Sequence, residues 1–242
     1  MFSIIIPAYN EEKYIGRCLK SILNLKTNQE YEVIVVNNAS TDRTSEVVKE
    51  ILPEAKVVYE SKKGLTRAYN RGAQEAQGDI LVFVDADMVL PPNHLERISK
   101  EFKKDRQLVA LSGPYLYKDG GKFCELLLRF TYLFLAMPAE IIFNRFLKLG
   151  AGVASGNSAI KKEAFKKING FNKEIFYGLE ADFTMRIKKI GKVRFKYSFS
   201  AESSARRFRK EGLLRMLVRY ALNIIWPVFF GKPFTKGYID VR

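Results

Sequence analysis

The stretch that most constrains the fold of this chain is "ILVFVDADMVLPP", residues 80–92. Its first five residues, Ile80 to Val84, are all apolar and mostly β-branched or aromatic, which is typical of a strand buried on both faces. Asp85 and Asp87 follow directly, separated only by Ala86. Because a buried carboxylate is costly without hydrogen-bond donors or a cation beside it, we expect these two acids to have such a partner.

Short apolar runs alternate with segments of helical periodicity along the first half of the chain. The predicted strands are 2–7, 31–36, 56–60 and 80–84. The predicted helices between them are 11–25, 40–52 and 65–77, with Asn10 capping the first and Ser40 or Thr41 the second. Further strands are expected within 108–113, 153–160 and 192–200, and further helices within 161–168 and 180–190. This alternation predicts an α/β fold with a doubly wound, mostly parallel sheet flanked by helices.

The predicted organisation is a single domain over residues 1–204, followed by a basic, apolar helical tail over 205–242. Within the domain, residues 1–113 are regular and 114–204 less so, which indicates a ligand-binding half and an acceptor half. In a doubly wound sheet, ligands bind beyond the carboxyl ends of the strands. The two acids after residue 84 are therefore expected at the rim where a ligand binds.

The residues available for chemistry are few. The chain has one histidine, His94, and no GxxxxGK[ST] loop, which argues against a histidine-based triad, a histidine-rich zinc site and a phosphate loop of that type. An Asp-x-Asp pair presents hard oxygen ligands suited to Mg²⁺ or Mn²⁺, although a turn or helix-cap pair is the alternative. A second acidic pair, Glu180 and Asp182, offers a carboxylate general base, and the alternative is charge that complements a helix N-terminus.

Four stretches together are similar to the family-2 inverting nucleotide-sugar glycosyltransferases, whose fold is of the GT-A type. They are "SIIIPAYNEEKYIGRCLKSIL", "VVNNASTDRT", "GLTRAYNRGAQEAQGDILVFVDADMVLPP" and "SGNSAIKKEAFKKINGFNKEIFYGLEADFTMRIKKIGK". They follow one another in the family's order, and the resemblance covers residues 2 to about 200.

The resemblance implies a role for each matching position. Asp87 would ligate the metal, and Glu180 would be the catalytic base, with Asp182 as the second candidate. Asn37 and Asn38 depart from the family, which usually has aspartates there. This departure leaves open which nucleotide base the donor carries. Nucleotide-sugar binding would fall to Pro7, Ala8, Tyr9, Glu11, Asn38, Arg67, Asn70, Asp85, Ala86, Arg206 and Arg207.

The predicted activity is metal-dependent transfer of a sugar from a nucleoside-diphosphate sugar to an acceptor hydroxyl, with inversion at the anomeric carbon. The enzyme would be of the hexosyltransferase type, acting in polysaccharide, glycolipid or glycoprotein glycan synthesis. One alternative is a nucleotidyltransferase that makes a nucleotide sugar. Another is a non-enzymatic, basic membrane-binding module.

The net charge of +15 calls for an anionic partner. Nucleic acid is not expected, because carboxylates beside phosphates need a cation. Segments 123–149 and 213–230 are apolar but carry charges, so we expect them to lie at an anionic membrane surface rather than cross it. The alternative is that the two segments pack on each other, within one chain or across a homodimer. Two isolated cysteines and the strand that follows Met1 directly predict a cytoplasmic protein. The apolar segments and their basic residues place it peripherally at the inner face of the membrane, where its acceptor would be a glycan or lipid-linked.

Overall fold

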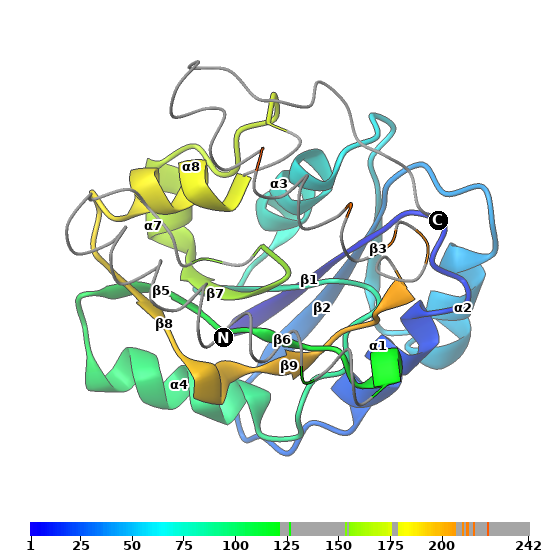
Figure 1. Ribbon diagram of the computed structural model, residues 1–242, viewed down its shortest axis with the longest axis horizontal. Coiled ribbons are helices and arrows are strands. Elements are labelled where there is room, and N and C mark those ends of the chain that lie inside the picture. The colour runs from blue at the N-terminus through cyan, green and yellow to red at the C-terminus, as the bar shows by residue number, and fades with distance from the viewer. Residues whose placement is uncertain are drawn as a thin grey trace.

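The structure is a computed structural model (Figure 1). It describes residues 1–121, 126, 153, 155–175, 179–206, 210, 212, 215 and 222. Most of the predicted apolar segments 123–149 and 213–230 lies outside the described residues, as does Arg207. The membrane contact, the homodimer and the division at residue 204 therefore stay predictions.

The central sheet has seven strands in the order β3-β2-β1-β4-β7-β5-β8. All neighbouring strands are parallel except β7, which runs antiparallel to both β4 and β5. The predicted doubly wound, mostly parallel sheet is confirmed. The strands are β1 (Phe2–Ala8), β2 (Tyr31–Asn37), β3 (Lys56–Tyr59), β4 (Ile80–Val84), β5 (Leu108–Ser112), β7 (Asn157–Lys161) and β8 (Lys192–Phe195). A second, two-stranded sheet pairs β6 (Tyr115–Leu116) with β9 (Ala201–Glu202).

Helices cover both faces of the central sheet, so the domain has three layers (Figure 1). They are α1 (Ile15–Leu23), α2 (Thr44–Ile51), α3 (Leu65–Glu75), α4 (His94–Lys104), α7 (Lys162–Lys167) and α8 (Leu179–Ile187). Two short 3₁₀ helices, η1 (Lys118–Gly120) and η3 (Tyr197–Phe199), complete the described elements. The sheet separates two apolar cores, one beneath α1, α2 and α4 and the other beneath α3, α7 and α8.

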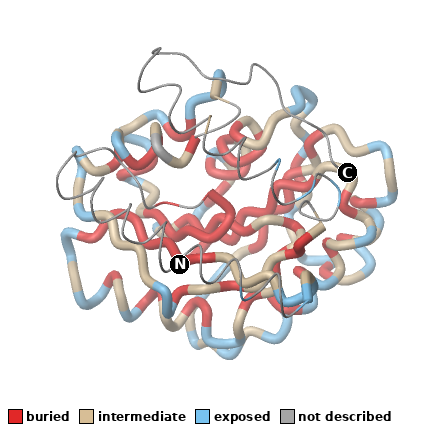
Figure 2. Tube along the Cα trace, in the orientation of Figure 1, coloured by how far each residue is buried: buried red, intermediate tan, exposed pale blue. Residues whose placement is uncertain are grey.

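Strand β1 shows why its sequence has no polar alternation. Ile4 and Ile6 pack into the first core, whereas Ile5, which points to the opposite face, packs into the second. All three side chains are fully buried. The centre of the domain, where the sheet lies, is coloured as buried in Figure 2. A strand with helices on both faces has no solvent side, and its apolar run is continuous for that reason.

The predicted helix caps are wrong, although the helices exist. Helix α1 begins at Ile15 rather than near residue 11, and Asn10 adopts a positive φ of 53° instead of capping it. The Asn10 Oδ1 accepts a hydrogen bond from the Thr41 N–H at 2.9 Å, which joins the loops after β1 and β2. Asparagine tolerates this left-handed conformation better than most residues, so a contact between loops replaced a local cap.

The antiparallel strand β7 brings distant sequence to the end of β4. Val84 pairs with Asn157, and the Asp85 N–H donates to the Gly156 carbonyl at 3.3 Å. A Cβ on residue 156 would lie about 2.0 Å from the Asp85 Oδ2, far inside van der Waals contact, so only glycine fits there. The segment before β7 is thus held against the first acid of the Asp-x-Asp pair.

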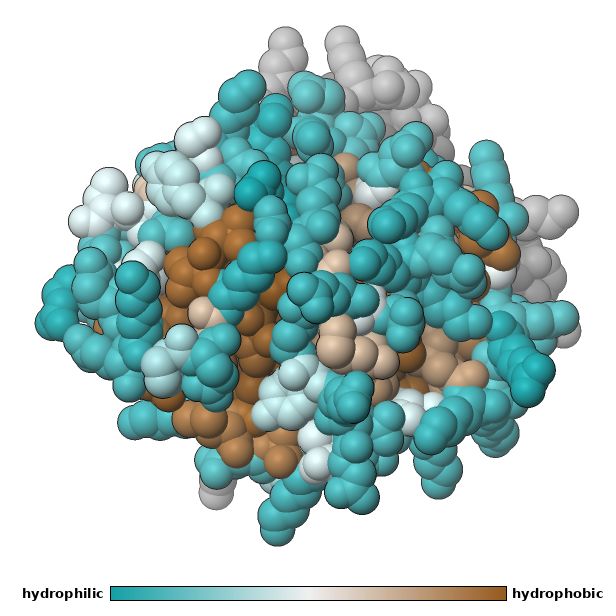
Figure 3. All heavy atoms as spheres, turned by 180° about the vertical axis from the view of Figure 1, so that it is seen from behind, coloured by the Kyte–Doolittle hydropathy of each residue, from teal (hydrophilic) through white to brown (hydrophobic). Residues whose placement is uncertain are grey.

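The face of the domain seen from behind is largely hydrophilic. Figure 3, which views the molecule from behind, shows an apolar strip enclosed by polar and charged side chains. No helix within the described ranges is long and apolar enough to cross a membrane.

The buried His94 predicts a pH dependence of stability. It is 1% exposed, its ring stacks on Phe199 with centroids 4.6 Å apart, and its Nδ1 has no hydrogen-bond partner among the described residues. Burial, together with the nearby Arg97 charge, lowers the pKa of His94 to about 3. Below pH 6.5 the unfolded chain therefore binds a proton that the folded chain does not, and the free energy of unfolding decreases as the pH falls towards 3.

We expect His94→Phe, which keeps the aromatic stack, to remove this dependence. Between pH 8 and pH 5 the wild type should lose about 2 kcal/mol more of its free energy of unfolding than the variant does, since each unit of pKa difference is worth about 1.4 kcal/mol. Urea denaturation at both pH values measures the difference. Parallel losses in the two proteins would contradict the assignment to His94.

Candidate active site

The first acid of the Asp-x-Asp pair is held by a buried tyrosine. The Tyr69 hydroxyl, on α3, donates a hydrogen bond of 2.5 Å to the Asp85 Oδ1. Burial and the Asp85 charge raise the pKa of Tyr69 well above its ordinary value, so its hydroxyl stays protonated and can donate. Tyr69 is therefore the hydrogen-bond donor expected from the sequence beside the Asp85 carboxylate.

The second acid is paired with an arginine from the far end of the domain. The Arg206 Nε lies 3.1 Å from the Asp87 Oδ2, and the two terminal nitrogens of Arg206 contact both carboxylate oxygens of Glu11 at 2.6 and 2.7 Å. Glu11 is only 1% exposed, and the guanidinium also lies 4.4 Å from the Tyr14 ring centroid. One cation thus pairs with two carboxylates at the rim of the sheet.

The backbone that carries Arg206 is fixed by several contacts. Glu202 forms a bridge with Val89, just beyond the Asp-x-Asp pair. The Ser204 hydroxyl and the Ala205 N–H both donate to the Asp119 carboxylate, at 2.8 and 2.7 Å. Burial lowers the pKa of the Arg206 guanidinium, but its hydrogen bonds to Glu11 and the Asp87 charge more than offset this, so the net pKa is raised and the group stays charged.

Asn38 holds the loop that follows β3. Its Nδ2 donates to the carbonyls of Glu60 and Lys62 at 3.0 and 2.9 Å, and its Oδ1 accepts from the Gly64 N–H at 2.8 Å. An aspartate here would place a carboxylate oxygen against two carbonyl oxygens, which is unfavourable without a donor. The departure from the family's aspartate therefore has a structural reason in this chain.

Tyr9 lies at the same edge of the sheet, partly exposed. Its hydroxyl and ring both contact the Lys63 ammonium, which lies 4.3 Å from the ring centroid. Tyr9, Glu11 and Asn38 follow the carboxyl ends of β1 and β2, as predicted, and lie on the side of the Asp-x-Asp pair expected to hold a nucleotide.

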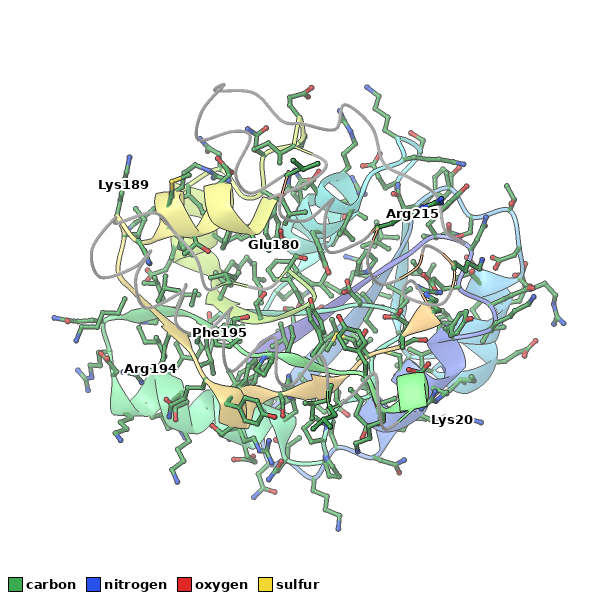
Figure 4. The ribbon with its side chains drawn as sticks, in the orientation of Figure 1. Lys20, Glu180, Lys189, Arg194, Phe195 and Arg215 are labelled. Atoms are coloured by element: carbon green, nitrogen blue, oxygen red, sulfur yellow. The ribbon has the colours of Figure 1, made fainter. Side chains whose placement is uncertain are left out.

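The second acidic pair is divided by its contacts. The Ser155 hydroxyl donates to the Glu180 Oε1 at 3.0 Å, at the N-terminal end of α8 (Figure 4). Asp182 instead pairs with Arg186, whose Nε and Nη2 contact the Asp182 Oδ2 at 3.0 and 2.6 Å. Arg186 in turn donates to the carbonyls of Ile168 and Gly170, so Asp182 belongs to a contact that holds α8 on the loop after α7.

Other predicted positions have contacts within the protein itself. The Asn70 amide is bonded in both directions to the Phe171 backbone, at 2.8 and 2.9 Å, and Arg67 pairs with the exposed Glu174 at 3.7 Å. Pro7, Ala8 and Ala86 are buried in or beside the core.

Residues that the sequence did not single out complete the site. Tyr69 holds Asp85, the Tyr115 hydroxyl accepts from the Gly156 N–H at 3.0 Å, and Ser155 contacts Glu180. Burial and the Asp85 charge also raise the pKa of Tyr115 well above its usual range. The sequence indicated that the Asp85 carboxylate needs a hydrogen-bond donor. Nothing along the chain indicated that the hydroxyl of Tyr69 would supply it.

Asp87 fits a divalent cation at this site. Its carboxylate oxygens are the hard ligands that such an ion prefers, and the positive charge that stabilises them in this structure is Arg206, whose Nε lies 3.1 Å from the Asp87 Oδ2, so a bound cation would take over that role. Across the described ranges, no group of three or more His, Cys, Asp or Glu side chains is arranged to hold a metal. A metal here would therefore need ligands from a substrate, which is how Mg²⁺ is often bound beside phosphates.

Comparison with known proteins identifies the family of this domain. The model of glycosyl transferase family 2 matches residues 3–169, so the chain belongs to that family. The predicted family and its GT-A type fold are confirmed.

Relatives and solved structures extend this result. A dolichol-phosphate mannosyltransferase of Pyrococcus furiosus is 36% identical over 123 residues, which is 50% of this chain and 34% of the relative. A Pyrobaculum calidifontis mannosyltransferase in complex with GDP-Man and Mn²⁺ superposes with a TM-score of 0.63 at 22% identity, covering 91% of this chain and 64% of that one. An S. aureus TarS fragment with UDP-GlcNAc gives 0.64 at 22% identity, covering 84% and 58%. The chain spans about a third of the length of the Pyrococcus furiosus relative.

The ion pair of Arg206 with Glu11 predicts a large stability effect. We expect Arg206→Ala to lower the free energy of unfolding by about 3 kcal/mol, because removing one partner leaves the other charge buried and uncompensated. Arg43→Ala is the matched control, since Arg43 pairs with Glu50 at the exposed surface, where such pairs contribute about 1 kcal/mol or less. Urea denaturation compares them, and equal losses would contradict the prediction.

Proposed function

We propose that this domain transfers a sugar from a nucleoside-diphosphate sugar to an acceptor hydroxyl, with inversion at the anomeric carbon. The observation that carries the proposal is the short link between two acids of different elements. Gly156 lies against the Asp85 carboxylate, and its neighbour Ser155 contacts the Glu180 carboxylate. A donor-side acid and an acceptor-side acid are thereby held at one rim of the sheet. Family membership favours this reaction over nucleotidyl transfer and over a binding module without activity.

In this proposal the donor lies along the carboxyl ends of β1, β2 and β4. Tyr9, Glu11 and the loop held by Asn38 flank the nucleoside, and Asp85, oriented by Tyr69, faces its ribose. Arg206 pairs with Asp87 in this structure, and it could bind the donor diphosphate instead when the donor is present. The diphosphate oxygens suit the planar guanidinium fork. The predicted contacts of Arg67, Asn70 and Arg207 with the donor remain part of the proposal.

Asp87 would hold Mg²⁺ or Mn²⁺ together with the diphosphate oxygens. When bound, such an ion neutralises the negative charge that develops on the leaving diphosphate. The chain's own contribution is to position the Asp87 carboxylate, which its contacts with Arg206 and Ser203 support. The Mn²⁺ in the Pyrobaculum calidifontis complex is consistent with this assignment.

Glu180 is the proposed general base. A base must be unprotonated and able to reach the acceptor hydroxyl. Asp182 is held by Arg186 on the α7 side of the helix, whereas Glu180 lies on the same short link as Asp85. Glu180 would take the proton of the acceptor hydroxyl as its oxygen attacks the anomeric carbon from the face opposite the diphosphate. The acceptor is proposed to be a glycan or a lipid-linked hydroxyl.

Replacing each acid in turn by its amide separates the roles of Glu180 and Asp182. We expect Glu180→Gln to reduce turnover by on the order of 10³-fold, because the proton acceptor is lost, while the variant stays folded. Asp182→Asn should keep turnover within about tenfold and lower the free energy of unfolding by about 1 kcal/mol through its weakened pair with Arg186. Release of nucleoside diphosphate from UDP-GlcNAc or GDP-mannose with Mn²⁺ measures both. The opposite pattern would make Asp182 the base.

Nucleotide binding tests the metal assignment independently of catalysis. Calorimetric titration with UDP and with GDP, each with and without Mn²⁺, should show affinity at least about tenfold higher with the metal for the wild type. Asp87→Asn should lose this difference and Asp79→Asn should retain it, since Asp79 pairs with the chain terminus at the surface. A metal effect that survives in Asp87→Asn would refute Asp87 as the ligand.

A further inference from the structure

The Ser155 hydroxyl directly contacts the carboxylate of the proposed base, Glu180. Its hydroxyl lies 3.0 Å from the Glu180 Oε1, and the residue is only 6% exposed. An ionised carboxylate can only accept hydrogen bonds, so in the active form of the base the serine must be the donor. This bond fixes the direction of one carboxylate oxygen of Glu180.

The backbone that carries the Ser155 hydroxyl is fixed by hydrogen bonds of the neighbouring residues. The Ser158 hydroxyl donates to the Ser155 carbonyl at 3.2 Å, and the Asn157 Nδ2 donates to the Phe199 carbonyl at 2.8 Å. On the other side, the Val153 N–H donates to the Thr184 Oγ1 at 3.2 Å, and this hydroxyl donates to the Glu180 carbonyl at 2.7 Å. The segment before β7 is thus joined to the first turn of α8 through both the backbone and the side chain of Glu180.

The next residue ties the same segment to the donor side. Gly156 packs against the Asp85 carboxylate, its carbonyl accepts from the Asp85 N–H at 3.3 Å, and its N–H donates to the Tyr115 hydroxyl. Two consecutive residues therefore determine where both acids lie. A shift of this segment would move Glu180 relative to the ribose side of the site.

We propose that Ser155 is a positioning residue that orients the Glu180 carboxylate towards the acceptor hydroxyl. This inference rests on the proposed function, in which Glu180 is the base. Ser155 itself touches neither donor nor acceptor. Its loss should therefore lower turnover without weakening donor binding, because a misdirected base affects the reacting geometry and not the nucleotide contacts.

The test compares Ser155→Ala with a rescue variant and a matched control. Turnover and KM for UDP-GlcNAc or GDP-mannose are measured with Mn²⁺ as release of nucleoside diphosphate. We expect kcat to fall about 100-fold in Ser155→Ala, with the donor KM unchanged within about twofold. Ser155→Thr, which retains a hydroxyl, should recover most of kcat. Ser99→Ala removes an equally buried serine hydroxyl on α4 and should leave both constants unchanged.

Each remaining outcome has a defined meaning. An unchanged kcat in Ser155→Ala, or a fall in kcat matched by weaker donor binding, overturns the inference. Glu180→Gln, measured in parallel, distinguishes failure of the proposed function from failure of the role of Ser155. Full activity of Glu180→Gln refutes the proposed function. An inactive Glu180→Gln together with a fully active Ser155→Ala refutes only the role of Ser155. A crystal structure of Ser155→Ala needs no substrate. The Glu180 carboxylate should leave its wild-type orientation, and an unchanged orientation also overturns the inference.

Discussion

The contact of one guanidinium with two acids is the interaction on which the rest of the site depends. Glu11 follows β1, Asp87 follows β4, and both point into a region that the fold shields from water. Two carboxylates of like charge at that rim would repel each other and lose hydration without compensation. Arg206 offsets part of this cost, and its own position is set by the contacts of residues 202–205 with Val89 and Asp119. The end of the domain is thereby joined to its first strand through charge.

The antiparallel strand β7 has the second large effect on the site. Its insertion between β4 and β5 places residues 155–156 beside Asp85, although 70 positions separate Asp85 from Ser155. The close approach is possible because residue 156 has no Cβ. Helix α8 then packs against the same face as α3 and brings Glu180 to Ser155. Asp85, after β4, and Glu180, on α8, are therefore separated by a short, hydrogen-bonded stretch of backbone, which gives the two acids a defined relative position.

Several side chains that motif matching assigns to the ligand have structural contacts in this chain. The Asn38 amide holds the loop after β3, and the Asn70 amide holds the loop before Phe171. Asn10, expected to cap a helix, instead bonds to the loop of Thr41. In each case the sequence identified a polar residue at the correct edge of the sheet. Its partner is remote in sequence, so local patterning could not show whether the side chain would face a ligand or a neighbouring loop.

The sequence by itself determined the class of fold, the family and the edge of the sheet where chemistry is expected. Apolar runs at Phe2–Ala8 and Ile80–Val84 specify buried strands, because only a strand covered on both faces lacks a polar alternation. Position after such a strand was enough to place Asp85 and Asp87 at the rim. The tertiary structure alone decided which groups meet there: Arg206 with Glu11, Tyr69 with Asp85, and Ser155 with Glu180. These pairs lie between 16 and 195 positions apart, and whether such groups touch depends on strand order and helix packing, which no local sequence pattern encodes.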